Sequence, residues 1–376
     1  MASLKDAPLS SERPPSIDRE TAKAAFLQAH GYGNVRRESL GGDASTRSYE
    51  RLHREGGGSF IFMDQPPSVE TAPCPPDATP AERAALGYNA LARLAAGRVD
   101  AFVACAGWLN AQGLSAPKVL AADPIAGLAV LEDLGDDLYA RLIEAGTDEA
   151  PLYDAAIDGL LALHAAPTPG VLEFDGSTWP LLVYDDLALK TAHDIFIEWL
   201  PKFRPVTFDA NTLAEWEAIW SPIRSLGEAG ATVFCHRDYH AENLIWLPER
   251  QGAARVGMLD FQDAVLAHPA WDLSMLLHDA RRTVSPEREA ACLDRYLAAR
   301  PELDRIAFLA DYHALGALNI ARILGIFARL VTRDGKPRYE QFMPRLWTYL
   351  DVCLADPALA RLKAWFDIYV PAEARR

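Results

Sequence analysis

The chain has 376 residues, of which 50% are hydrophobic and 24% are charged. This length and apolar content provide for a large core and for two domains, and they exclude a disordered or fibrous chain. Lys and Arg number 37 against 52 Asp and Glu, so the formal net charge is −15. Because such a charge repels nucleic-acid backbones and anionic membrane surfaces, we expect neither as a partner. A phosphorylated ligand remains compatible, since glycine loops and metal ions set that attraction locally.

The five cysteines are widely spaced and form no CxxC pair, so reduced thiols are expected rather than a disulfide framework or a zinc site. Residues 1–16 lack the apolar core of a secretory signal and are expected to form a flexible tail. The apolar stretch 314–331 contains Asn319, Arg322 and Arg329, which favours a half-buried helix over a membrane span. We therefore expect a cytoplasmic protein, and no obligate protein partner is evident.

In chain order, the first third combines helical patterns with β-structure. Residues 17–30 carry helix formers and end at Gly31. Between 39 and 67, a Gly pair, an alternating run, a Gly triplet and an apolar run before two prolines predict a hairpin. The Pro- and Ala-rich stretch 68–82 indicates a flexible insertion. Two helices and two strands are then predicted, at 83–96, 99–112, 117–123 and 127–134.

After Gly135 the pattern becomes mainly helical, interrupted by two strand-like runs, "ATVFCH" and "RVGMLDF". The sequence therefore predicts an α+β protein in two parts. Its expected divisions are the tail 1–16, a small β-rich N-terminal lobe at 17–133 and a larger helical lobe at 134–376.

A cluster of chemically active side chains lies between those two strand-like runs, in "FCHRDYHAENLIWL". The spacing His236-x-Asp238-x4-Asn243, followed by a strand and Asp260, resembles the catalytic loop and metal-binding motif of protein-kinase-like phosphotransferases. Phosphoryl transfer requires Mg²⁺, a hard ion that prefers oxygen ligands, and Asn243 and Asp260 can supply two. A third oxygen, on Asp238, must face the attacking hydroxyl. His236 is expected to hold the loop by hydrogen bonds.

A zinc site is the competing interpretation of the same stretch. His236 and His240 are four residues apart, and Glu242 follows them. Such a site needs a helix, and the flanking β-type runs argue against one.

The gap between Asp260 and "PAWDLSMLL" is too short for the activation segment of a protein kinase. Together with the catalytic-loop and metal-binding motifs, this resembles the aminoglycoside phosphotransferase and choline kinase family, which phosphorylates small molecules. Within that family, six phrases together make the chain similar to bacterial kinases of the anomeric hydroxyl of N-acetylmuramate and N-acetylglucosamine in cell-wall recycling: "GGDASTRSYER", "MDQPP", "LEDLGDDLY", "CHRDYHAENL", "LDFQDA" and "ILGIFARLVTRDGK". The resemblance covers roughly residues 17 to 350, and it implies a protein-kinase-like two-lobed fold that uses ATP and Mg²⁺.

The resemblance also implies where the nucleotide binds. Gly42 allows main-chain amides to approach phosphate oxygens, and Ser45 adds a hydroxyl. The strand before Gly135 is similar to the hinge that binds adenine through main chain near Glu132 and Leu134. An ordinary turn and a plain domain linker are the alternatives for these two stretches.

One departure from the kinase pattern is the lysine that reaches the α and β phosphates. Met63 stands in its place, and "VDAFVACAGWLNAQ" has no interior glutamate to partner it. Losing both is physically consistent, because one alone would be an unpaired charge in a closed site. Arg47, and less strongly Lys118, are candidates to replace the charge, although each could equally be a solvated surface residue.

Asp263, His240 and Glu198 are the candidates to contact the sugar. Asp263 could instead cap a neighbouring segment, and Glu198 could lie on a plain helix surface. Arg322 and Arg329, seven residues apart on one helix face, could bind a lactyl carboxylate, although salt bridges are favoured. We expect Trp271 to pack in the core and Asp272 to brace the catalytic loop. A kinase of another small alcohol, and a pseudokinase that only binds a ligand, remain alternatives.

Overall fold

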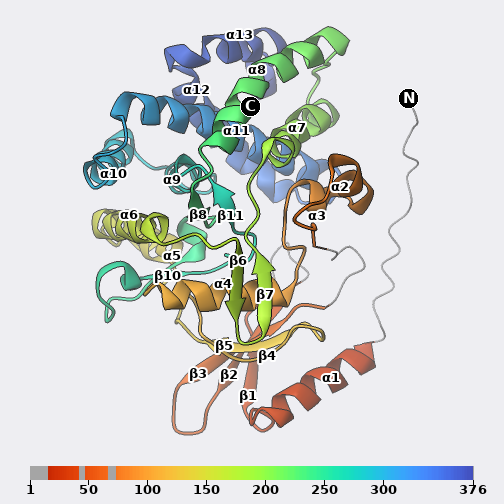
Figure 1. Ribbon diagram of the computed structural model, residues 1–376, viewed down its shortest axis with the longest axis vertical. Coiled ribbons are helices and arrows are strands. Elements are labelled where there is room, and N and C mark those ends of the chain that lie inside the picture. Colours follow the sequence, from red (N-terminus) through yellow and green to blue (C-terminus); the bar gives the residue numbers. More distant parts are fainter. Residues whose placement is uncertain (1–15, 42–46, 67–72, 376) are drawn as a thin grey trace. The chain divides into compact units, whose positions relative to one another are not determined.

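The computed structural model describes residues 16–41, 47–66 and 73–375 (Figure 1). By their contacts, these residues form two compact units. The first contains the described residues up to 66 together with 119–133, and the second contains 73–118 and 134–375.

The first unit is a five-stranded antiparallel sheet with one helix, α1 (Ser16–Ala29). Its strands, in spatial order, are β1 (Arg36–Ser39), β2 (Ser48–His53), β3 (Ser59–Asp64), β5 (Leu128–Glu132) and β4 (Val119–Asp123). The β2–β3 turn contains Gly56, Gly57 and Gly58, all with φ between 83° and 105°. Only glycine adopts this region at no steric cost, which explains the triplet.

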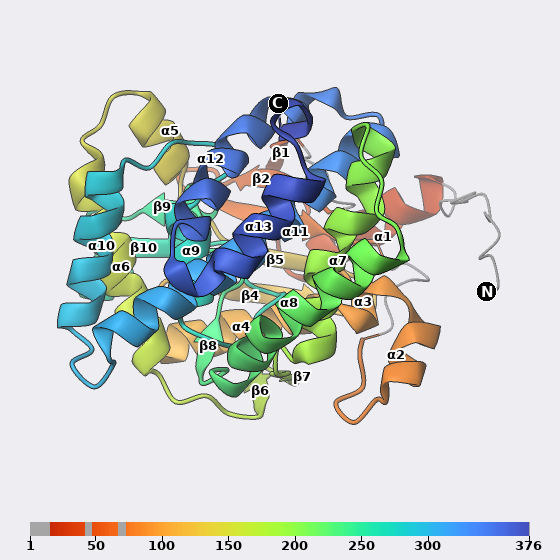
Figure 2. The same ribbon diagram turned by 90° about the horizontal axis from the view of Figure 1, so that it is seen from above.

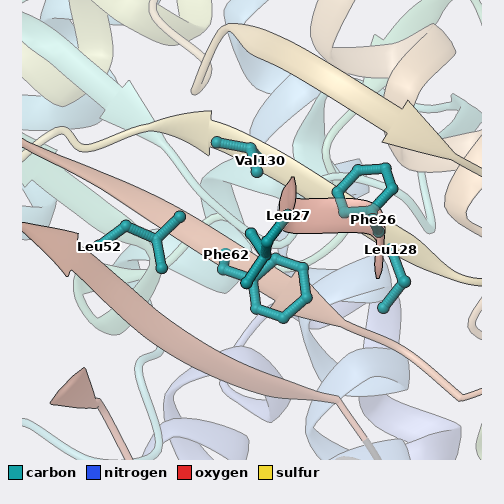
Figure 3. Close-up of a cluster of buried hydrophobic side chains, with 6 residues drawn as sticks. All are labelled: Phe26, Leu27, Leu52, Phe62, Leu128 and Val130. Atoms are coloured by element: carbon teal, nitrogen blue, oxygen red, sulfur yellow. The ribbon is translucent and has the colours of Figure 1, made fainter. Parts of the chain in front are cut away.

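A small hydrophobic core joins α1 to one face of this sheet. Alternation along the strands places apolar side chains of β2, β3 and β5 on the same face, where they meet α1. Figure 3 shows the buried members, Phe26, Leu27, Leu52, Phe62, Leu128 and Val130. Lys23 of α1, only 6% exposed, lies 3.1 Å from Glu50 and 3.5 Å from Asp64, so an ion-pair network flanks the apolar contact.

The second unit contains three two-stranded antiparallel sheets and most of the helices. Its strand pairs are β6 (Val171–Phe174) with β7 (Ser177–Pro180), β8 (Val233–Cys235) with β11 (Val265–Ala267), and β9 (Leu244–Trp246) with β10 (Val256–Met258). Its α-helices are α2 (Pro80–Leu86), α3 (Tyr88–Leu91), α4 (Val99–Ala111), α5 (Tyr139–Glu144), α6 (Glu149–Ala165), α7 (Asp186–Phe203), α8 (Ala210–Ala229), α9 (Ala270–Leu277), α10 (Pro286–Ala298), α11 (Arg305–Thr332), α12 (Met343–Leu354) and α13 (Ala360–Tyr369).

Helix α11 is the central helix of the second unit and packs against α7, α9 and α12 (Figure 2). Gly325 permits the close crossing of α7 and α11, because a Cβ there would lie 2.5 Å from the Phe196 main-chain nitrogen. Among the described residues, α11 is the one helix whose length and composition would suit a membrane span. Since 72% of its apolar window is buried inside the fold, it equally meets the description of a core helix.

Residues 73–118 belong by their contacts to the second unit, although the sequence placed them in the N-terminal lobe. The reason is the apolar helix α4, which packs against the β6–β7 hairpin so closely that a Cβ on Gly107 would overlap the Phe174 ring. The chain passes from the first unit to the second between Asp133 and Leu134, where the sequence also changes character. The tail and lobes as functional divisions stay predictions.

Candidate active site

Two strand pairs of the second unit, β8–β11 and β9–β10, present the loops that carry the predicted catalytic residues. The loop 236–243 connects β8 to β9, and residues 259–264 connect β10 to β11. Beyond the β9–β10 register, the Leu259 N–H donates to the Asn243 carbonyl at 2.9 Å. Consequently, Asn243 and Asp260 stand beside each other at one end of the β9–β10 pair, next to the loop of Asp238.

Asp272, at the start of α9, braces the catalytic loop. Its carboxylate accepts the main-chain N–H groups of His236 at 2.7 Å and Arg237 at 2.8 Å, and the Cys235 thiol at 3.2 Å. Burial opposes its ionisation, but the His164 imidazole at 3.7 Å and these donors prevail and lower the pKa of Asp272. This confirms the expected bracing role.

Two residues of this site, Arg237 and Asp260, have left-handed backbone conformations, with φ of 78° and 62°. Such values are uncommon for non-glycine residues and persist where the surroundings fix them. The Arg237 guanidinium donates to the carbonyls of Ala92 and Arg93 at 3.0 and 3.2 Å and lies over the Tyr184 ring. Contacts to the segment that follows α3 therefore fix the loop beside Asp238.

His236 does not hold the loop in the way expected from the sequence. Neither ring nitrogen has a hydrogen-bond partner within the described part of the chain, and the ring instead packs edge-on against Tyr239 and Phe261. Its main-chain N–H, rather than its side chain, provides the hydrogen bond that anchors the loop.

Asp238 is partly exposed, with a side-chain exposure of 30%, and its carboxylate lies 3.7 Å from the Arg322 guanidinium of α11. The Asn243 amide nitrogen donates to the Asp238 carbonyl at 2.9 Å. This bond orients the amide, so that its oxygen is directed away from that carbonyl. The Asn243 oxygen is thereby left available to a ligand, and its binding of a metal together with Asp260 stays a prediction.

The donor set fits Mg²⁺ rather than zinc. Asn243 and Asp260 offer hard oxygen atoms, and Gln262 donates to Asp260 Oδ1 at 2.9 Å, which fixes the carboxylate. Residues 236–240 form no helix, so His236 and His240 do not share the helical face that a zinc site requires. Within the described ranges, no group of three or more His, Cys, Asp or Glu is arranged to hold a metal.

A cavity of about 160 Å³ opens beside Asp238 within the second unit. Its apolar wall includes Met275, Ile323 and Phe327. Its polar lining residues are Asp238, His240, His278, Asp279, Arg281 and Arg322. Burial lowers the pKa of His240, so the imidazole is neutral at neutral pH. Its Nδ1 atom is buried without a hydrogen-bond partner in the described structure, and it can serve a bound ligand.

The structure brings some of the predicted substrate residues to this cavity and leaves others apart. His240 lines the cavity, whereas Glu198 on α7 has 59% side-chain exposure and pairs with Lys202 at 3.3 Å. Asp263 accepts the Ala95 N–H at 2.6 Å, so at least one of its oxygens stabilises a neighbouring segment. Contact of Asp263 and Glu198 with a sugar stays a prediction.

The predicted nucleotide-binding residues lie mostly in or near the first unit. Gly42 and Ser45 lie outside the described residues. Arg47 donates to Gln65 at 3.2 Å and to the Tyr49 hydroxyl at 3.1 Å, so it is not a solvated surface charge. Glu132 ends β5 and Leu134, 9% exposed, begins the second unit. Met63 is buried in β3.

Three polar residues of the cavity lining were not found from the sequence, namely His278, Asp279 and Arg281. They follow α9 in "LLHDARRTVS". The adjacent arginines after an apolar helix were the available signal, but nothing local indicates that this segment meets α11 and the catalytic loop.

The protein has a β-rich first unit and a mainly helical second unit, and the loop of Asp238 lies next to Asn243 and Asp260. These features define an α+β protein of the kinase-like fold class. An ethanolamine kinase of Plasmodium vivax has the same fold, with a TM-score of 0.55 at 12% identity over 94% of this chain and 98% of that one. The fold class expected from the sequence is confirmed.

Family comparison is more specific. Residues 36–309 match the model of the phosphotransferase enzyme family, and the chain belongs to this family. It is 88% identical, over 96% of its length and 99% of the relative's, to the N-acetylmuramate/N-acetylglucosamine kinase of Caulobacter vibrioides. The kinase of the same name from Pseudomonas aeruginosa is 31% identical over 89% of both chains. The family resemblance and the expected enzyme class, a phosphotransferase, are thus confirmed.

Proposed function

We propose that this enzyme transfers the γ-phosphoryl group of ATP to the anomeric C1 hydroxyl of N-acetylmuramate, of N-acetylglucosamine, or of both. The high identity to a kinase of that name over nearly the whole chain supports the choice of sugars. The structural observation that supports the reaction is that Asp238, on the loop after β8, lines a small cavity together with Arg322 and His240. The product is a sugar 1-phosphate, consistent with recycling of cell-wall sugars in the cytoplasm.

Asp238 acts as the general base in this proposal. A hemiacetal hydroxyl is more acidic than an ordinary alcohol, so a carboxylate of ordinary basicity suffices to accept its proton late in a loose, in-line transition state. The Arg322 guanidinium holds the carboxylate at the cavity. Because the bracing by Asp272 fixes the loop in advance, most of the rate enhancement comes from positioning and charge neutralisation.

Asn243 and Asp260 would hold Mg²⁺, which neutralises triphosphate charge when bound. For the nucleotide, the proposed residues are Gly42, Ser45 and Arg47 at the phosphates and main chain near Glu132 and Leu134 at the adenine. Arg47 is the proposed replacement for the missing phosphate-binding lysine. These assignments rest on the positions of the residues in the motifs, and the role of each residue can be tested by substituting it.

Phosphorus NMR of the product formed from N-acetylmuramate and ATP tests the proposed function. A phosphorus signal coupled to the anomeric proton is expected. A 6-phosphate, or no product with either sugar, would contradict the proposal. Parallel assays with choline and an aminoglycoside separate it from kinases of other alcohols, and nucleotide binding without turnover on any acceptor would favour a pseudokinase.

A further inference from the structure

Two arginines line the cavity beside Asp238, and one of them is already engaged. Arg322 Nε donates to Asn319 Oδ1 at 3.0 Å, and its Nη2 lies 3.7 Å from Asp238. Its guanidinium also lies over the Trp271 ring. These contacts come from three directions, so Arg322 belongs to the positioning of the catalytic carboxylate.

Arg281 differs from Arg322. Across the described ranges, its guanidinium makes no hydrogen bond and no ion pair within 4.0 Å, although its main-chain N–H donates to Asp279 at 2.8 Å. The ion pairs of the neighbouring carboxylates are made by Arg282 instead, which lies 3.5 Å from the Asp279 carboxylate and 3.9 Å from that of Glu242. The Arg281 side chain is thus a cation of the cavity that no described anion holds in a hydrogen bond or close ion pair, although its charge acts on the nearby Glu242 carboxylate.

The charge of the protein makes such a cation informative. The chain carries a formal charge of −15, and two carboxylates, those of Asp238 and Asp279, line the cavity. An anionic ligand entering this environment is repelled unless a nearby cation compensates. Arginine suits this task, because its planar guanidinium binds a carboxylate through two parallel hydrogen bonds.

We propose that Arg281 binds the carboxylate of an acidic sugar and thereby sets the preference of the enzyme for N-acetylmuramate over N-acetylglucosamine. The inference rests on the proposed function. The two sugars differ by a lactyl ether on O3, two ring carbons from the reacting C1, which adds one carboxylate. Because Asp238 and Arg281 line the same cavity, a sugar with C1 at Asp238 can place that carboxylate at Arg281, whereas N-acetylglucosamine offers Arg281 no anion.

The test measures kcat/KM for both sugars with Arg281→Gln and Arg281→Lys. A charge-assisted hydrogen-bond pair predicts that Arg281→Gln lowers the ratio of kcat/KM for N-acetylmuramate to that for N-acetylglucosamine by about tenfold to a hundredfold. Lysine keeps the charge but loses the bidentate geometry, so Arg281→Lys restores part of the ratio. The ratio is insensitive to a general loss of folded enzyme, which lowers both values together.

Arg361→Gln is the matched control, because it removes one positive charge from an exposed position on α13. It should leave the ratio unchanged. An equal loss with both sugars in Arg281→Gln, or an unaltered ratio, would overturn the inference while leaving the proposed function intact. A wild-type protein that phosphorylates neither sugar would overturn the proposed function and the inference with it.

Discussion

The Arg322 guanidinium lies 3.7 Å from the Asp238 carboxylate, although one residue belongs to α11 and the other to the loop after β8. The central helix of the second unit therefore reaches directly to the candidate base. Since Arg322 also bonds to Asn319 one turn earlier on the same helix, its guanidinium is fixed before substrate binds. This pair links the packing of the helical unit to the geometry of catalysis.

Arg322→Gln should lower kcat by about tenfold to a hundredfold, because the carboxylate of Asp238 loses the cation that positions it. Steady-state kinetics with saturating ATP measures the effect. Arg329→Gln is the control, since Arg329 lies one heptad further along α11 and over the Tyr88 ring, outside the cavity lining. Equal losses in the two variants would mean that Arg322 supports the helix rather than Asp238.

Asp238→Ala should abolish transfer, with kcat falling by about 10² to 10⁴, the usual contribution of a positioned general base. Within the described part of the chain, the ion pair of this carboxylate is the partly exposed one with Arg322, so its loss should leave the fold intact. Nucleotide affinity, measured by calorimetry with MgATP, should stay close to that of the wild type. Undiminished turnover would remove Asp238 from its proposed role.

Asp272→Asn should destabilise the protein by about 2 to 4 kcal/mol, because an amide cannot accept at both oxygen positions and the buried N–H groups lose partners. Chemical denaturation measures the loss, and kcat should fall as well, because the loop of Asp238 is no longer braced. Asp351→Asn is the matched control. Its side chain is 63% exposed and pairs with Arg375 at 3.3 Å, so its effect should stay below about 1 kcal/mol.

How much of the site the sequence predicted depends on whether its residues are close in the chain. Asp238, Asn243 and Asp260 follow strands at short, fixed spacings, and the required chemistry identifies them. Arg281 and the contact of Arg322 with Asp238 depend on α9 and α11 meeting the loop, and no local pattern specifies that packing.

Helix faces show the same limit of sequence analysis. The amphipathic pattern around Glu198 predicts the helix α7 but not which ligand, if any, its exposed side faces. Likewise, Gly87 divides the stretch expected as one helix at 83–96 into α2 and α3, because its φ of 98° is incompatible with a continuous helix. Local composition indicated the elements, whereas single backbone angles and tertiary contacts decided their ends.

Stability should fall as the pH drops below about 6.5, the ordinary pKa of histidine. Burial lowers the pKa of His193, and the Arg224 guanidinium 3.3 Å away adds to this against the opposing carboxylate of Asp194. Below the pKa that this histidine has in the unfolded chain, the unfolded state therefore binds more protons than the folded state. The contribution of neutral His193 to the free energy of unfolding is fully present above the unfolded-state pKa. It is lost as the pH falls toward the pKa of His193 in the folded protein.

Urea denaturation between pH 8 and pH 5.5 checks this dependence. A single buried histidine contributes a slope of up to about 1.4 kcal/mol per pH unit within the window. His193→Gln should reduce the slope, because it removes one of the buried imidazoles. A slope that is the same in wild type and variant would show that other groups cause the acid sensitivity.

Gly325→Ala should destabilise the second unit by about 1 to 3 kcal/mol, even though alanine is the better helix former by about 1 kcal/mol. The added Cβ would lie 2.5 Å from the Phe196 nitrogen and 2.6 Å from the Ile195 carbonyl carbon, and main chain cannot rotate away as a flexible side chain can. Helices α7 and α11 must therefore separate.

Gly170→Ala is the matched control, since nothing lies within 4 Å of a Cβ there and its φ suits alanine. Thermal denaturation should show a lower midpoint for Gly325→Ala alone, and because α11 also carries Arg322, kcat should fall with it at temperatures where the variant is still folded. A midpoint equal to that of Gly170→Ala would mean that the two helices have room to adjust.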